Sequence, residues 1–239
     1  MIPIKDTVYR ISVPWVTGAL VAINTIVFVF ELSLPKTLLS DLFHTFGLVP
    51  EHFARVGGHH LSPDDYLSFF TNMFLHGGWL HLIGNMWFLY LFGRSVEDRM
   101  GHGRFLLLYL LSGIGAGVTY FLLTPHSTVP TIGASGAIAG VMAAYVVLFP
   151  RAKVLTLIPI IFIPLFVELS AFVYVAYWFL IQLLLGAASL GAQTAEGGVA
   201  WWGHVGGFVT GIILVFLLRP APRKLRKDYP DERYKHASP

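Results

Sequence analysis

The chain has 239 residues, of which 55% are hydrophobic and only 12% are charged. An ordinary soluble domain has about 25% charged residues, so this composition excludes a soluble globular protein and predicts a multi-pass membrane protein. Because the chain has no cysteine, a disulfide framework, a thiol nucleophile and a thiolate metal site are excluded as well.

A helix needs about 20 apolar residues to cross the hydrocarbon core of a bilayer. Segments that meet or approach this length predict an all-α membrane protein with six transmembrane helices, at Trp15–Leu34, Phe69–Phe92, Phe105–Leu123, Gly133–Phe149, Ser170–Leu190 and Val199–Leu218. A further apolar segment, Val154–Phe166, is short and contains Pro159 and Pro164. We expect it to be an interfacial or re-entrant piece and not a seventh span.

These spans divide the chain into three parts: an N-terminal segment at residues 1–14, a six-helix domain at 15–218 and a basic tail at 219–239. The tail is rich in proline and charge, so we expect it to be disordered, with a basic run suited to anionic lipid headgroups. The long first loop, about residues 35–66, is expected to form an ordered cap that lies partly in the membrane interface.

The basic residues gather on one side of the predicted membrane. Only Lys36 and Arg55 of the 16 lysines and arginines fall on the other side, which leaves 14 on the first. The positive-inside rule makes that side cytoplasmic, with both termini inside, and the simple pattern without a cleavable leader predicts a cell (inner) membrane protein. The net charge of +3 therefore reports topology, and we expect no nucleic-acid partner.

Ser135 stands between Gly133 and Gly136 at the start of the fourth predicted span. The amide groups at a helix N-terminus are unpaired and the helix dipole favours negative charge, so a serine there suits a nucleophile whose oxyanion must be stabilised. Gly136 and Gly140 also have the GxxxG spacing of closely packed helices. The alternative is that Ser135 only caps the helix and the glycines only pack.

His204 begins the sixth predicted span and is followed by Gly207 and Gly211, again with GxxxG spacing. This spacing would let the sixth helix press against the fourth and bring the imidazole to the serine hydroxyl. A neutral histidine is the usual general base for such a hydroxyl. A histidine that only hydrogen-bonds across the bundle is the alternative. Glu31 is expected near the outer end of the first span, and no buried acidic residue is available to orient the histidine, so the pattern favours a serine–histidine dyad over a triad.

His81 and Asn85 are one helical turn apart, so both project from the same face of the second predicted span. Both can donate hydrogen bonds to an oxyanion. A zinc site formed by His76, His81 and His204 is the competing interpretation, but no carboxylate or HExxH spacing accompanies these histidines. We therefore expect no metal and no other cofactor.

The three motifs together are specific. The sequence GASG at Gly133–Gly136, the HxxGxxxG spacing at His204–Gly211 and the HxxxN spacing at His81–Asn85 resemble the rhomboid family of intramembrane serine proteases of the bacterial type. Their order, the number of spans and their common depth at the outer face agree with the family too. The resemblance covers roughly Trp15–Leu218 and implies a six-transmembrane-helix rhomboid-like bundle.

The resemblance also implies an activity and roles for individual residues. The expected reaction is hydrolysis of peptide bonds in or near transmembrane segments of membrane protein substrates, within the lipid bilayer. Ser135 would be the nucleophile and His204 the general base, while Asn85, His81 and the Ser135 backbone amide would form the oxyanion hole. The alternative is a proteolytically inactive rhomboid-like protein that binds transmembrane helices.

Two positions depart from the family pattern. Some bacterial relatives have a Trp-Arg pair shortly before the second span, where this chain has Leu67 and Ser68. Some also have a tyrosine one turn after the serine that stacks on the catalytic histidine, and this chain has Ala139 there. The second departure leaves open which group supports His204.

Overall fold

Helices predominate in the part of the chain that the computed structural model describes, residues 1–54, 63–160, 163–191 and 200–218. The helices are α1 (Trp15–Ser33), α2 (Lys36–Phe46), α3 (Pro50–Ala54), α4 (Pro63–Thr71), the 3₁₀ helix η1 (Asn72–Phe74), α5 (Trp79–Phe88), the π-helical turn η2 (Leu89–Gly93), α6 (Arg94–Met100), α7 (His102–Leu123), α8 (Ser135–Leu148), α9 (Ala171–Gly191) and α10 (Trp201–Leu218). The strands are β1 (Ile2–Asp6), β2 (Lys153–Ile160) and β3 (Ile163–Ser170). The expected basic tail at 219–239 lies outside the described residues.

The expected all-α membrane bundle is confirmed, but four and not six of the described helices are long and apolar enough to cross a membrane. By length and composition, α1, α7, α9 and α10 can each cross a membrane, and α8 is an apolar helix of only 14 residues. The second span starts later than expected. The chain turns at residues 75–78, which include two consecutive glycines, and then runs in helical conformation through α5, η2 and α6. Glycine is a poor helix former, which accounts for the break.

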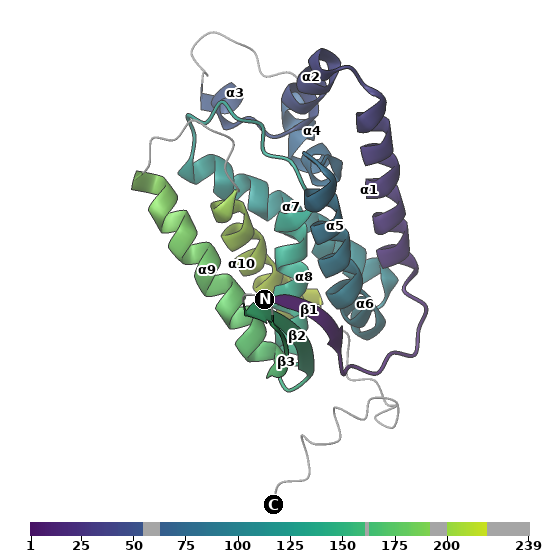
Figure 1. Ribbon diagram of the computed structural model, residues 1–239. Coiled ribbons are helices and arrows are strands. Elements are labelled where there is room, and N and C mark those ends of the chain that lie inside the picture. The colour runs from purple at the N-terminus through teal and green to yellow at the C-terminus, as the bar shows by residue number, and fades with distance from the viewer. Residues whose placement is uncertain (55–62, 161–162, 192–199, 219–239) are drawn as a thin grey trace, which may run out of the picture.

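The described residues of the apolar segment Val154–Phe166 form no helix. They supply most of a β-hairpin in which β2 and β3 pair antiparallel, from Lys153 opposite Ser170 to Ile160 opposite Ile163. The N-terminal strand β1 pairs antiparallel with the other edge of β2, so the order in the sheet is β1-β2-β3. Figure 1 shows the sheet at one end of the bundle, with α2 and α3 at the other end.

Helix α8 is the centre of the bundle, and Ala137 to Tyr145 are all buried. Glycines let its neighbours approach closely. A side-chain carbon on Gly207 or Gly211 of α10 would collide with the backbone of Gly136 or Gly140 on α8. On its other side α10 packs against α7, because a side-chain carbon on Gly206 would collide with Thr119 of α7. The GxxxG spacing thus does place the sixth span against the fourth.

Candidate active site

The short length of α8 places its first residue inside the bundle. Fourteen residues of helix span about 21 Å, whereas the hydrocarbon core of a bilayer is about 30 Å thick. The chain before α8 therefore enters the bundle as irregular backbone, held where the amide and carbonyl of Thr131 pair with Leu48 and where the Gly133 amide donates to the Asn72 carbonyl at 2.8 Å. Such backbone is tolerated at membrane depth only where protein surrounds it or a cavity adjoins it. Ser135, the first residue of α8, is half-buried there.

Ser135 and His204 are in contact. The distance from Ser135 Oγ to His204 Nε2 is 2.8 Å, which is a hydrogen bond between α8 and α10. His204 is buried and only 8% exposed. The N-cap residue of α8 is Ala134, with no side-chain hydrogen bond at the cap. The hydroxyl of Ser135 is thus used across the bundle and not as the cap of its own helix.

The second ring nitrogen of His204 has a partner that the sequence motifs did not indicate. His204 Nδ1 lies 2.7 Å from Oε1 of Gln182, a buried residue on α9. The rings of Trp178 and Trp201 also lie near the imidazole, with centroids 5.9 and 6.1 Å away. The one signal in the sequence was the carboxamide of Gln182 inside the predicted span Ser170–Leu190, which is a costly position that calls for a partner.

His81 and Asn85 reach the same place from α5. A side-chain carbon on Gly133 would clash with the His81 ring and lie 3.4 Å from Asn85 Nδ2, so both side chains face the backbone just before Ser135. Gly133 has φ of +120°, a backbone conformation that other residues rarely adopt. Glycine at this position is therefore required twice, by the backbone conformation and by the space that His81 occupies.

His76, which precedes α5, supports Asn85. Its Nε2 atom lies 3.0 Å from Asn85 Nδ2, and its ring stands 5.1 Å from the His81 ring. The backbone amide of His76 donates to the buried Glu31 carboxylate of α1 at 3.2 Å. The sequence motifs indicated His76 only as a possible zinc ligand and indicated no role for Glu31. Both ring nitrogens of His204, the third candidate zinc ligand, already have protein partners.

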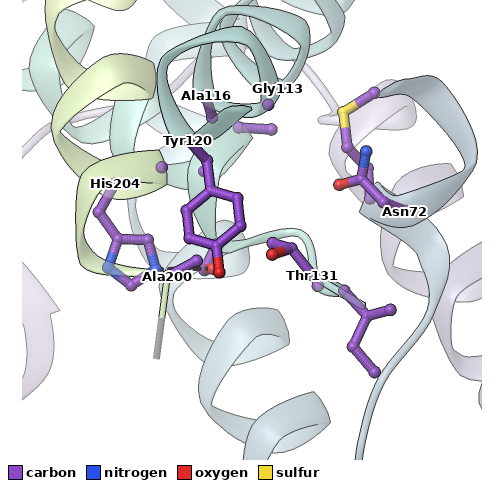
Figure 2. Close-up of a pocket in the computed structure, with 15 residues that line it drawn as sticks. Asn72, Gly113, Ala116, Tyr120, Thr131, Ala200 and His204 are labelled. Atoms are coloured by element: carbon purple, nitrogen blue, oxygen red, sulfur yellow. Dashed lines mark hydrogen bonds between the residues drawn. The ribbon is translucent and has the colours of Figure 1, made fainter. Parts of the chain in front are cut away.

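A small cavity of about 20 Å³ adjoins Ser135 and His204. Its walls come from η1, α7, α8, α10 and the chain entering α8, and Figure 2 shows His204 and Tyr120 on them. Small residues of α7 line much of it, including Gly113, Ala116 and Gly117. A cavity of this size holds about one water molecule. The serine therefore has space for one small reactant on this side.

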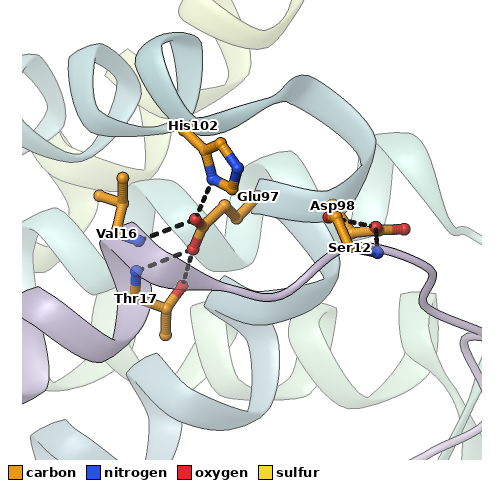
Figure 3. A network of polar contacts seen from close by, with 6 residues as sticks. All are labelled: Ser12, Val16, Thr17, Glu97, Asp98 and His102. Carbon is orange, nitrogen blue, oxygen red and sulfur yellow. Dashed lines mark hydrogen bonds and ion pairs between the residues drawn. The ribbon is translucent and has the colours of Figure 1, made fainter.

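Buried carboxylates gather away from this site, where α1, α6 and α7 meet near the sheet. Helix α1 has no side-chain cap of its own, and the Glu97 carboxylate of α6 accepts from the backbone amides of Val16 and Thr17 at 2.8 and 2.7 Å. It also accepts from Thr17 Oγ1 and pairs with His102 Nδ1 at 2.6 and 2.5 Å (Figure 3). A negative charge at a helix N-terminus is favourable, so Glu97 fixes the start of α1 to the bundle.

The residues before α1 are held to the same region. Asp98 accepts from the Ser12 amide at 2.6 Å, and Ser95 Oγ donates to Asp6 of β1 at 2.9 Å. Arg10 forms an ion pair with Asp6 and a hydrogen bond of 2.9 Å from its Nε to Ser95 Oγ. The expected N-terminal segment thus lies docked on the bundle.

The fold and the site together define a multi-pass membrane protein whose bundle encloses a hydrogen-bonded serine and histidine at the N-terminal ends of two helices. The chain belongs to the rhomboid family, because the Rhomboid domain of that family matches residues 63–221.

The relatives of this chain include one named a rhomboid protease and one named an inactive rhomboid protein. The chain is 32% identical to Rhomboid-like protein 11, chloroplastic, of Arabidopsis thaliana over 72% of the chain and 61% of that protein. It is 39% identical to Rhomboid protease GluP of Bacillus subtilis (strain 168) over 38% of the chain and 18% of GluP. It is 32% identical to Inactive rhomboid protein 1 of Drosophila melanogaster over 36% of the chain and 6% of that protein. In each case the chain spans less than two thirds of the relative.

Proposed function

We propose that this protein is an intramembrane serine endopeptidase that hydrolyses peptide bonds in or near the transmembrane segments of other membrane proteins. The observation that carries the proposal is the 2.8 Å contact between Ser135 Oγ and His204 Nε2 at the N-terminus of α8. A nucleophile in hydrogen-bonding contact with its base is the geometric signature of covalent catalysis by serine. Family membership supports the same reaction, since a relative is a protease.

The proposed reaction has two stages. Ser135 Oγ attacks the scissile carbonyl carbon while His204 Nε2 takes the hydroxyl proton, and His204 then gives this proton to the departing amine nitrogen as the peptide bond breaks. The acyl group now on Ser135 is attacked by water, which loses its proton to His204. The serine leaves with that proton and the carboxyl product is released. The cavity of about 20 Å³ beside Ser135 is large enough for the water that this second stage needs.

The oxyanion formed in each stage is assigned to three donors. We propose that the Asn85 amide, the His81 ring and the Ser135 backbone N–H stabilise it, because the two side chains flank Gly133 and the backbone group belongs to the N-terminus of α8. Unpaired amides and the helix dipole favour negative charge at this end. Each side-chain donor is then expected to contribute about 2.7 to 4 kcal/mol in the transition state.

The proposed setting follows from the distribution of charge. We place the protein in the cell (inner) membrane, with the end of the bundle that carries the sheet facing the cytoplasm. Residues 15–218 are the proposed catalytic domain, and residues 219–239 are a basic tail directed toward anionic lipid. The chain has no cysteine, so single cysteines test this directly. We expect a membrane-impermeant maleimide to label Lys36→Cys in intact cells and Lys153→Cys only after permeabilisation. The reverse pattern would invert the topology.

The activity is tested by cleavage of a single-span model substrate by the purified protein in detergent, resolved on a gel. Ser135→Ala and His204→Ala are run beside it, and a fluorophosphonate probe reports reactivity of the serine independently of substrate choice. We expect cleavage and labelling with the unaltered protein and neither with the two variants. The alternative function is that of an inactive rhomboid-like protein that binds transmembrane helices. That alternative is supported if the unaltered protein cleaves none of a panel of substrates and also resists the probe.

A further inference from the structure

The proposed base needs a group that holds its ring, and the structure offers one in Gln182. Its Oε1 atom lies 2.7 Å from His204 Nδ1, and the residue is only 5% exposed. The orientation of the amide group is fixed by its other end, since Gln182 Nε2 donates to the Trp178 carbonyl at 3.4 Å. Turning the amide over would place Oε1 against that carbonyl oxygen, and two acceptors repel one another.

This arrangement decides which ring nitrogen carries the proton. Because Oε1 can only accept, Nδ1 of His204 must donate, and in the neutral ring Nε2 is then the acceptor. Nε2 is the atom that contacts Ser135 Oγ at 2.8 Å. The imidazole is therefore held in the one tautomer that can take a proton from the serine.

On this geometry, and resting on the proposed protease function, we propose that Gln182 is the positioning residue of His204. It fixes the tautomer and the ring plane before reaction, and it accepts a hydrogen bond from the imidazolium that forms when Ser135 attacks. In soluble serine proteases a buried aspartate has this task. A neutral amide does it here without placing a second charge inside the membrane, where an ionised carboxylate is expensive.

The proposal also accounts for Ala139. A tyrosine at this position could stack on His204, but alanine cannot, and the ring is instead held by a hydrogen bond from α9 with Trp178 close by. It follows that α9 is part of the active site. During peptide-bond hydrolysis α9 therefore has to occupy the position seen in this structure, with Gln182 in contact with His204.

Two substitutions separate the acceptor from the volume of the side chain. Gln182→Met keeps the size and removes the acceptor, while Gln182→Glu in its protonated form keeps an acceptor oxygen for His204 and a donor for the Trp178 carbonyl. Leu184→Met is the matched control, because Leu184 lies on the same helix and is 61% exposed. All three are purified in detergent, checked by thermal unfolding, and assayed for kcat and KM on a model substrate and for the rate of fluorophosphonate labelling.

We expect Gln182→Met to lower kcat by about 10- to 100-fold, as for the loss of a hydrogen bond to a charged group, with KM changed less than about threefold. The labelling rate should fall in parallel, because the small probe needs the base but no substrate helix. Gln182→Glu should stay within about tenfold of the unaltered protein, and Leu184→Met should not differ from it.

Three results would overturn the proposal. The first is a Gln182→Met protein with unaltered kcat. The second is a lower kcat with an unaltered labelling rate, which would assign Gln182 to substrate binding. The third is a Gln182→Glu protein as inactive as Gln182→Met, which would make the acceptor irrelevant. Failure of the underlying function is a separate outcome, because then the unaltered protein itself would neither cleave nor be labelled.

Discussion

Replacement of Gly211 by alanine is expected to damage the active site from two helical turns away. A β-carbon at this position of α10 would lie 2.7 Å from the carbonyl carbon of Gly140 and would overlap other backbone atoms of α8. Carbon atoms in contact normally stand about 3.5 to 4.0 Å apart, so α10 would have to move away from α8 by about 1 Å. Backbone cannot turn aside as a side chain can.

The movement acts directly on the proposed catalytic contact, since His204 and Ser135 are carried by these two helices. A shift of about 1 Å takes the Nε2 to Oγ distance from 2.8 Å to about 3.8 Å, beyond the limit of a hydrogen bond. A misplacement of this size lowers kcat by about 100-fold. The overpacked interface should also reduce the free energy of unfolding by about 1 to 3 kcal/mol.

The assay compares Gly211→Ala with Gly18→Ala, which makes the same chemical change on α1 where no atom lies within 4 Å of the added carbon. We expect the control to keep its kcat and to gain about 0.5 to 1 kcal/mol of stability, because alanine is the better helix former. Thermal unfolding in detergent and kcat on a model substrate are measured for both. A folded Gly211→Ala protein with kcat within about threefold of the unaltered one would show that close contact between α8 and α10 does not set the catalytic geometry.

Three further predictions concern other parts of the molecule. Asn85→Ala should lower kcat by about 100- to 1,000-fold with KM nearly unchanged, measured on the same substrate, and an equal rise in KM would instead assign Asn85 to binding. Gly133→Ala should lower the fluorophosphonate labelling rate by about 100-fold, because the added carbon displaces the His81 ring; normal labelling would contradict this packing. Glu97→Gln should reduce the free energy of unfolding by about 2 to 3 kcal/mol, since several donors lose a charged acceptor, whereas His102→Ala, with a side chain 47% exposed, should cost under about 1 kcal/mol. Equal losses in a thermal unfolding experiment would argue against Glu97 as the anchor of α1.

The sequence predicted those parts of the fold that depend on long hydrophobic segments and on glycine spacing. Long apolar runs identified the membrane helices, and the glycine spacing in α8 and α10 predicted their close contact, which the structure shows. The segment Val154–Phe166 was ambiguous, because a short apolar run suits a helix or a strand equally well. Its hairpin depends on pairing with β1, which lies about 150 residues away in the sequence, and no local pattern reports such a pairing.

The candidate site divides in the same way. Ser135, His204, His81 and Asn85 could be named in advance because each stands in a short motif within an apolar segment, where a polar side chain is costly. Gln182 could not be assigned a partner from the sequence. Its neighbours along α9 are apolar, and only the packing of α9 against α10 brings its amide oxygen to the imidazole.

The sequence by itself determined that the chain crosses a membrane, which segments are apolar enough to cross it and which helices can approach closely, because all three follow from local composition and spacing. The tertiary structure alone decided the 2.8 Å contact of Ser135 with His204, the support of His204 by Gln182 and the capping of α1 by Glu97. Each of these is a hydrogen bond between residues of different helices. Its formation depends on where whole helices pack, and no residue carries that information alone.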